Sequence, residues 1–172
     1  GDALTYSLDT DAPNGTVVIN GTLATYTPDS NFNGDDTFTF MVSDGFLNDT
    51  AEVTLSVNAV NDAPVLATVS DVSFDEDSST SITLLGSDID GDDLSYSISD
   101  GIDIIAILEG SDIGFSAPTN FNGSETFTVT VSDGELSDSQ SITVTVNALN
   151  DAPVATIDLS DTTNEDQSVV VN

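Results

Sequence analysis

The chemistry open to this chain is limited by the side chains it contains. Its 172 residues include 31 Asp and Glu, and they include no Lys, Arg, His or Cys. The chain therefore has no Cys or His nucleophile, no Schiff-base lysine, no His general base and no arginine phosphate clamp. Its remaining ligand atoms are carboxylate, amide and carbonyl oxygens, which hard divalent cations such as Ca²⁺ prefer. Because clustered acids without basic partners repel one another, the composition favours calcium binding.

The same composition excludes several classes of partner. A chain of formal net charge −31 cannot displace the counterions of nucleic acid, and an anionic membrane surface would repel it. No apolar run approaches the 18 to 20 residues of a membrane-spanning helix, so we expect no membrane insertion. Zinc fingers, haem sites and iron–sulfur sites are excluded because they need Cys or His.

The acids and asparagines with the most suggestive spacing lie in turns. The stretch Asp88–Asp93 has aspartates at alternate positions, although a solvated turn would have the same composition. It is not an EF-hand loop, because no Glu closes a twelve-residue loop. Asn61–Pro64 is compatible with both ligation and an extended linker. Asp44 and Asp133 each precede a glycine, which favours hairpin turn residues over ligands.

Internal repetition shows how these residues must be positioned. Three blocks recur at one offset of 89 residues: 31–34 at 120–123, 42–45 at 131–134, and 57–65 at 146–154. The pattern predicts a partial repeat lacking its first strands (1–60), a complete repeat (61–149) and the opening strands of a third (150–172). Two interpretations remain open. The chain is a window of a longer array, or its C-terminal strand is donated to a neighbouring subunit.

Apolar residues alternate with Thr and Ser in several segments. Residues 38–42, 53–57, 127–131 and 142–146 have apolar side chains at every second position, and Asn-Gly or Asp-Gly turns fall between such segments. A period of two with β-branched residues predicts half-buried antiparallel strands. About seven strands per repeat predict an all-β chain of tandem immunoglobulin-like Greek-key sandwiches, with about 89 residues per repeat.

The repeated motifs carry a family resemblance. Asn-Asp-Ala-Pro-Val at 61–65 and 150–154, Asn-Phe-Asn-Gly, Val-Ser-Asp-Gly and the stretch Asp88–Asp92 together resemble the cadherin-like tandem repeats of giant bacterial surface adhesins. The resemblance covers nearly the whole chain. It implies a secreted, cell-surface protein whose repeats stack end to end and are rigidified by Ca²⁺ at their junctions.

The resemblance also implies two sets of ligands. The first set joins the partial and complete repeats, and it comprises Asn33, Asp35 or Asp36, Asn61, Asp62, Asp88 and Asp90. The second set lies at the following junction, and it comprises Glu76, Asn122, Glu125, Asn150 and Asp151. The acid that usually precedes the linker Asn by two residues is replaced by Ala59 and Ala148, so the number of ions per junction stays open.

We expect a non-enzymatic structural module of an extracellular adhesin or filament, whose partners are neighbouring repeats or copies of itself. One alternative is a self-polymerising filament subunit joined by its donated C-terminal strand. Another is a glycan-binding module, although the absence of Trp disfavours a sugar platform. A surface glycan or protein ligand could also bind elsewhere in the parent chain. A two-carboxylate hydrolase is disfavoured because it needs one acid of raised pKa in an apolar cleft.

Overall fold

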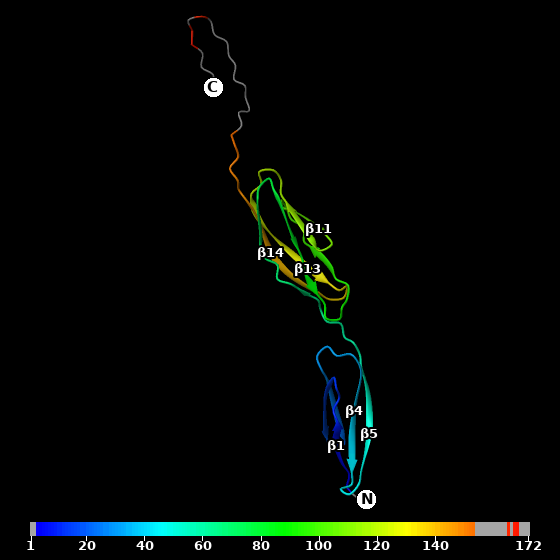
Figure 1. Ribbon diagram of the computed structural model, residues 1–172. Helices are drawn as coiled ribbons and strands as arrows, with labels where there is room; N and C mark the ends of the chain where they lie inside the picture. The colour runs from blue at the N-terminus through cyan, green and yellow to red at the C-terminus, as the bar shows by residue number, and fades with distance from the viewer. Residues whose placement is uncertain (1–2, 154–164, 166, 169–172) are drawn as a thin grey trace. The chain divides into compact units, whose positions relative to one another are not determined.

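The computed structural model describes residues 3–153, 165, 167 and 168 (Figure 1). All regular secondary structure in this part of the chain is β-strand. It contains no helix long and apolar enough to cross a membrane. The first five strands are β1 (Thr5–Thr10), β2 (Gly15–Asn20), β3 (Leu23–Pro28), β4 (Gly34–Ser43) and β5 (Asn48–Val57). The next nine are β6 (Val65–Leu66), β7 (Val72–Asp75), β8 (Ser79–Thr83), β9 (Gly86–Ser87), β10 (Ser95–Ile98), β11 (Ile105–Glu109), β12 (Asp112–Ser116), β13 (Gly123–Ser132) and β14 (Ser137–Asn147).

The first five strands form two antiparallel sheets. One sheet has the order β1-β4-β5, and β2 pairs with β3 in the other. The long β4–β5 ladder runs from Gly34 opposite Val57 to Ser43 opposite Asn48. Ala12, Val17 and Phe38 form the buried core between the sheets. This arrangement is a small sandwich.

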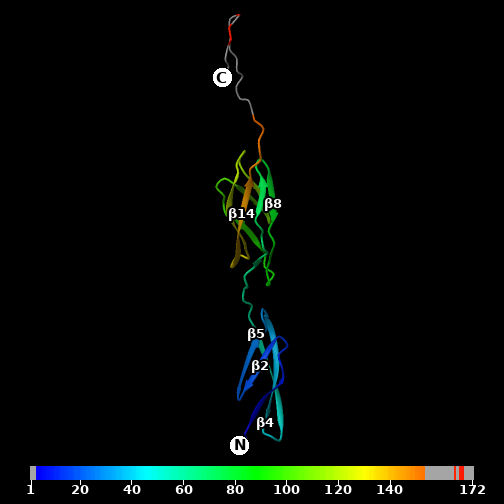
Figure 2. The same ribbon diagram turned by 90° about the vertical axis from the view of Figure 1, so that its left-hand side faces the viewer.

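The later strands form a larger sandwich, whose layers can be followed in Figures 1 and 2. One sheet has the order β10-β13-β14-β7, the other has the order β11-β12-β8, and β6 pairs with β9. Strand β7 is parallel to β14, whereas β8 is antiparallel to β12. These sheets and the first five strands confirm the predicted all-β, immunoglobulin-like class.

The alternation in β13 and β14 places one face of each strand in the core. The side chains at 127, 129, 131, 142, 144 and 146 are all at most 2% exposed. The Phe127 ring on β13 meets the Phe115 ring on β12 edge to face, with centroids 5.5 Å apart, so the two sheets contact each other directly. The period-two prediction is confirmed for these strands.

The matching residues of the first sandwich are less covered. Phe38 is buried like its counterpart Phe127, but Phe40 and Val53 are only half-buried, whereas their counterparts Val129 and Ile142 are fully buried. The physical reason is the number of strands. In the later sandwich β7 and β8 extend the two sheets, and the described part of the first sandwich has no strand at either place.

The two compact units of the structure do not have the same boundaries as the sequence repeats. One unit comprises 1–67, 85–96 and 130–139, and the other comprises 68–84, 97–129 and 140–172. Strands β13 and β14 contribute residues to both units because they are long. The predicted boundary between residues 60 and 61 stays a prediction. Most of the predicted third repeat, from residue 154 onward, lies outside the described residues.

Candidate metal centre

The loop that follows β9 holds three aspartates close together. Carboxylate oxygens of Asp88, Asp90 and Asp92 all lie within 4.8 Å of one another. Oxygens bound to one Ca²⁺ at about 2.3–2.6 Å can be at most about 5 Å apart, so these three can share one ion. Gly91 has a φ of +83°, a left-handed conformation that folds the loop back and favours glycine.

Asp88 organises the loop from within. Its Oδ1 accepts hydrogen bonds from the backbone N–H groups of Asp90 (2.8 Å), Gly91 (3.1 Å) and Asp92 (3.4 Å). Its Oδ2 is buried and has no hydrogen-bond partner. A buried carboxylate oxygen without a partner loses its hydration without compensation. The loop thus leaves one oxygen with unused ligand capacity beside two further carboxylates.

The linker that precedes β6 is tied to the same loop. The N–H of Asp62 donates to Oδ2 of Asp90 at 2.8 Å, and the side-chain amide of Asn61 donates to Oδ2 of Asp133 at 2.9 Å. Both linker residues are half-buried. Of the first predicted ligand set, Asp88 and Asp90 are therefore in the loop and Asp62 is bonded to it, whereas Asn61 is bonded to Asp133 in the β13–β14 hairpin.

Asp133 and Asp44 occupy equivalent hairpins. Oδ1 of Asp133 accepts the N–H groups of Glu135 (2.7 Å) and Leu136 (2.6 Å). In the same way, Oδ1 of Asp44 accepts the N–H groups of Phe46 and Leu47. The Leu136 N–H, the Asn61 amide and the Glu135 N–H hold the pKa of Asp133 below its ordinary value. Both aspartates are thus turn residues, as the Asp-Gly pairs predict, and Asp133 also binds the linker.

Asp36 and Glu125, two other predicted ligands, are equivalent at the repeat offset, and both are engaged by loops of their own repeat. Glu125 accepts three backbone N–H groups: its Oε2 binds Ile102 (2.8 Å), and its Oε1 binds Asp103 (2.7 Å) and Ile104 (3.3 Å). Burial acts to raise the pKa of Glu125, but these three donors outweigh it and the pKa is lowered.

Asp36 is only 2% exposed and binds the matching loop of the first sandwich. Its Oδ2 accepts the N–H of Asn14 (3.1 Å) and the hydroxyl of Tyr26 (2.9 Å), and its Oδ1 accepts the N–H of Thr37. Burial, the hydrogen bond to Asp36, and the charges of Asp36 and Asp29 raise the pKa of Tyr26 to about 12. These hydrogen bonds satisfy both oxygens of the buried Asp36 carboxylate, so its burial needs no bound ion.

The other predicted ligands are placed as follows. Asn33 and Asp35 are exposed, before and at the start of β4, and Asn122 is exposed before β13. Glu76 is 6% exposed, and its Oε1 accepts the N–H of Leu149. Asn150 and Asp151 are exposed, and the Asn150 amide donates to the Asp151 carbonyl oxygen at 3.1 Å. The three-aspartate cluster of the β9 loop includes none of these residues.

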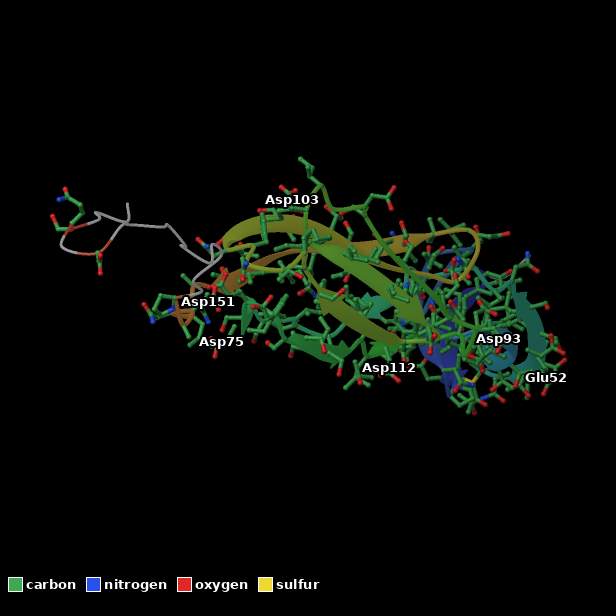
Figure 3. All side chains as sticks on the ribbon, turned by 90° about the horizontal axis from the view of Figure 1, so that it is seen from above. Glu52, Asp75, Asp93, Asp103, Asp112 and Asp151 are labelled. Atoms are coloured by element: carbon green, nitrogen blue, oxygen red, sulfur yellow. The ribbon has the colours of Figure 1, made fainter. Side chains whose placement is uncertain are left out.

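Sequence reasoning missed two residues of this site. Asp92 was left out of the ligand set, although its alternate spacing after Asp88 and Asp90 was a usable signal. The contact of Asp133 with Asn61 joins residues 72 positions apart, so no local pattern could have found it. Other acids of the described residues, such as Asp75, Asp103 and Asp112, are exposed at separate places on the molecule (Figure 3).

Comparison with known proteins defines the class of this chain. The profile of the bacterial Ig domain family matches residues 1–56 and 61–146. The chain therefore belongs to the bacterial Ig domain family, which agrees with the resemblance inferred from its motifs. No curated protein sequence matches the chain. Domains of this family are typically non-catalytic.

A solved cadherin structure has the same fold. The chain is similar to Drosophila N-cadherin EC1-4, with 20% identity and a TM-score of 0.57 over 87% of this chain and 42% of that one. An endo-fucoidan hydrolase from glycoside hydrolase family 107 matches with 23% identity and a TM-score of 0.41, over 87% of this chain and 24% of the hydrolase. This chain spans less than half the length of either, and the cadherin likeness supports a cadherin-like sandwich.

Proposed function

We propose that this chain is a non-enzymatic structural module of a bacterial surface protein, and that Ca²⁺ bound at Asp88, Asp90 and Asp92 orders its linker. The observation that carries the proposal is the buried, unpartnered Oδ2 of Asp88 beside two more carboxylates. A hard cation would satisfy that oxygen and remove the repulsion among three negative groups. Waters and backbone carbonyls commonly complete such a coordination shell.

The link from the ion to stiffness runs through Asp90. This residue is in the cluster and also accepts the N–H of Asp62 in the linker. Fixing the Asp90 carboxylate would therefore fix the chain at the start of the repeat as well. A linker ordered in this way suits a module that spaces other parts of a long surface protein, and bacterial Ig domains are common in such proteins.

The test is a thermal melt in about 10 mM CaCl₂ and in EDTA, with ionic strength matched by NaCl. Extracellular calcium modules bind with Kd values of about 10⁻⁴–10⁻³ M, so about 10 mM is ten to a hundred times Kd. One site then adds about 1.4–2.7 kcal/mol to the free energy of unfolding. This corresponds to about 5–15 °C in Tm for a repeat of this size. Sodium at equal ionic strength should give no such rise.

The matched variants are Asp92→Asn and Asp93→Asn. Both remove one exposed carboxylate from adjacent positions, but only Asp92 is in the cluster. We expect Asp92→Asn to lower the calcium-dependent rise and Asp93→Asn to leave it unchanged, because only the first replaces a charged carboxylate of the cluster with a neutral, weaker amide ligand. Equal rises for the two variants, or no calcium-specific rise in the wild type, would refute this site.

A further inference from the structure

Two segments of the complete repeat, residues 61–76 and residues 133–149, are bonded to each other along their length. The bonded residues are separated by a nearly constant 71 to 73 positions. The regular part of the contact is a parallel ladder, in which Val72–Asp75 of β7 lie opposite Val144–Asn147 of β14. The segment that enters the repeat is therefore joined directly to the segment that leaves it.

Side chains extend this contact beyond the backbone ladder. Before β7 the chain forms β6, where Val65 and Leu66 pair with β9 and not with β14. The N–H of Leu66 nevertheless donates to Oδ2 of Asp138 at 2.9 Å, and the N–H of Val69 donates to Oε1 of Gln140 at 3.0 Å. Both acceptors lie on β14. Two side chains of β14 thus hold a stretch of chain that forms no ladder with that strand.

Two further side-chain bonds lie on either side of these. Oδ1 of Asp71 accepts the N–H of Thr143 at 2.7 Å, immediately before the ladder begins, and the Asn61 amide donates to Asp133 at the start of the repeat. The side-chain brace is the name used below for these four bonds, which join Asn61, Leu66, Val69 and Asp71 to residues 133–143. Three of its four acceptors are carboxylates, and charged acceptors form stronger hydrogen bonds than neutral ones.

The parallel pairing determines how a pull on the ends of the repeat would act on these bonds. Tension along the chain pulls residue 61 and residue 149 in opposite directions. Two parallel segments pulled in this way slide along each other, so the bonds between them are loaded together. If the two segments were instead pulled apart from one end, their bonds would be loaded and broken one at a time.

We propose that the side-chain brace makes the complete repeat resistant to tension between its two ends. The proposal rests on the proposed function of a spacer in a long surface protein, but it does not rest on calcium, since no bond of the brace involves the three-aspartate cluster. The chain has no Lys or Arg with which to tie the two segments together. Backbone N–H groups and an amide serve as the donors to its carboxylates instead.

The experiment stretches single molecules of the full chain in an optical trap, in EDTA, so that a failure here is separate from a failure of the calcium site. Because the chain has no Cys, introduced cysteines attach handles at chosen positions. The exposed residues Val60, Glu135 and Leu149 provide them. Handles at 60 and 149 slide the two segments along each other, whereas handles at 60 and 135 peel the first segment from the hairpin beside it. We expect the second pair to detach the segment at a several-fold lower force.

A variant and its matched control test the brace itself. Asp71→Ala removes the acceptor of the Thr143 N–H, and Asp103→Ala removes the same charge from an exposed position before β11. At one fixed force between residues 60 and 149, we expect Asp71→Ala to raise the unfolding rate about ten-fold, equal to about 1.4 kcal/mol. Asp103→Ala should change that rate by about two-fold or less.

The comparison of the two handle pairs leaves the brace intact, so its result does not depend on how the Asp71→Ala variant folds. Equal forces for the two handle pairs would overturn the proposal, because bonds loaded together and bonds loaded in turn must differ. Equal unfolding rates for Asp71→Ala and Asp103→Ala would overturn it as well, since the brace would then carry no part of the tension.

Discussion

The substitution Glu125→Gln tests whether carboxylates inside the sandwich act as hydrogen-bond acceptors for a loop. Glu125 receives the N–H groups of Ile102, Asp103 and Ile104, with both carboxylate oxygens used. Glutamine keeps the length of the side chain but has only one acceptor oxygen. Its amide N–H₂ would face at least one backbone N–H, so one donor loses its acceptor and the others lose a charged partner.

The expected cost follows from these contacts. A hydrogen bond to a charged group contributes about 1.5–3 kcal/mol, and Glu125 is partly exposed, so we expect a loss of about 1–2 kcal/mol. For a repeat of this size that loss corresponds to a Tm lower by about 5–10 °C. The control is Glu135→Gln, the same chemical change at an exposed position of the β13–β14 hairpin, which should shift Tm by about 2 °C or less.

The pH dependence gives a second readout. Because the pKa of Glu125 is lowered in the folded state, its contribution is present above the unfolded pKa near 4.3 and is lost as pH falls through the folded value. We therefore expect the Tm gap between wild type and Glu125→Gln, in EDTA, to be constant near neutral pH and to close below about pH 4. Comparing the two proteins at each pH removes the effect of the other carboxylates. An equal Tm near neutral pH, or a gap that persists in acid, would refute the reasoning.

Three further outcomes are expected. Gly101→Ala should lower Tm, because its Cβ would lie 2.0 Å from the Ile104 carbonyl oxygen, whereas Gly114→Ala, with its nearest contact at 4.0 Å, should not; paired melts decide this. Asp36→Asn should lower the pKa of Tyr26 from about 12 towards 10, measured by ultraviolet absorbance against pH, and an unchanged titration would contradict it. Phe127→Ala should cost about 3–5 kcal/mol in chemical denaturation, and a loss below about 1 kcal/mol would exclude its central place in the core.

Much of the fold is readable from local patterns. Alternation of apolar residues with Thr and Ser has a period of two, and that period determines which side of β13 and β14 faces the core without knowledge of any partner strand. The Asp-Gly pairs at 44–45 and 133–134 form their turns through bonds to residues two and three positions on. These interactions lie within a few residues, so the sequence alone predicts them.

Part of the candidate site could also be predicted from the sequence. The family resemblance implied Asp88 and Asp90 as ligands, and their alternate spacing extends to Asp92, whose carboxylate lies in the same cluster. The equivalence of Asp36 and Glu125 was also visible from the repeat. Their bonds to loops 21 to 23 residues away were not, because those distances depend on how β4 and β13 cross the sandwich.

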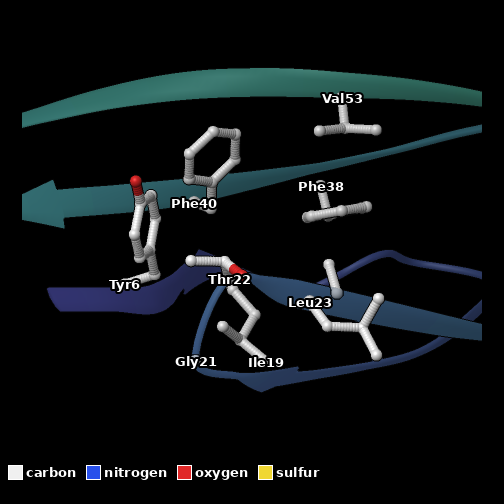
Figure 4. Close-up of a pocket in the computed structure, with 9 residues that line it drawn as sticks. Tyr6, Ile19, Gly21, Thr22, Leu23, Phe38, Phe40 and Val53 are labelled. Carbon is white, nitrogen blue, oxygen red and sulfur yellow. The ribbon is translucent and has the colours of Figure 1, made fainter.

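What the sequence by itself determined is the class of the protein: its all-β repeats, its turns, and a ligand chemistry restricted to oxygen. Only the tertiary structure decided which acids already have donors and which do not. It alone also showed that β3, which pairs only with β2 among the described residues, lies beside an apolar groove (Figure 4). The physical reason is that hydrogen-bond partners and covered surface are set by strand pairing over long sequence separations, such as Asn61 with Asp133. Neither the composition nor the period-two alternation shows which distant strands pair.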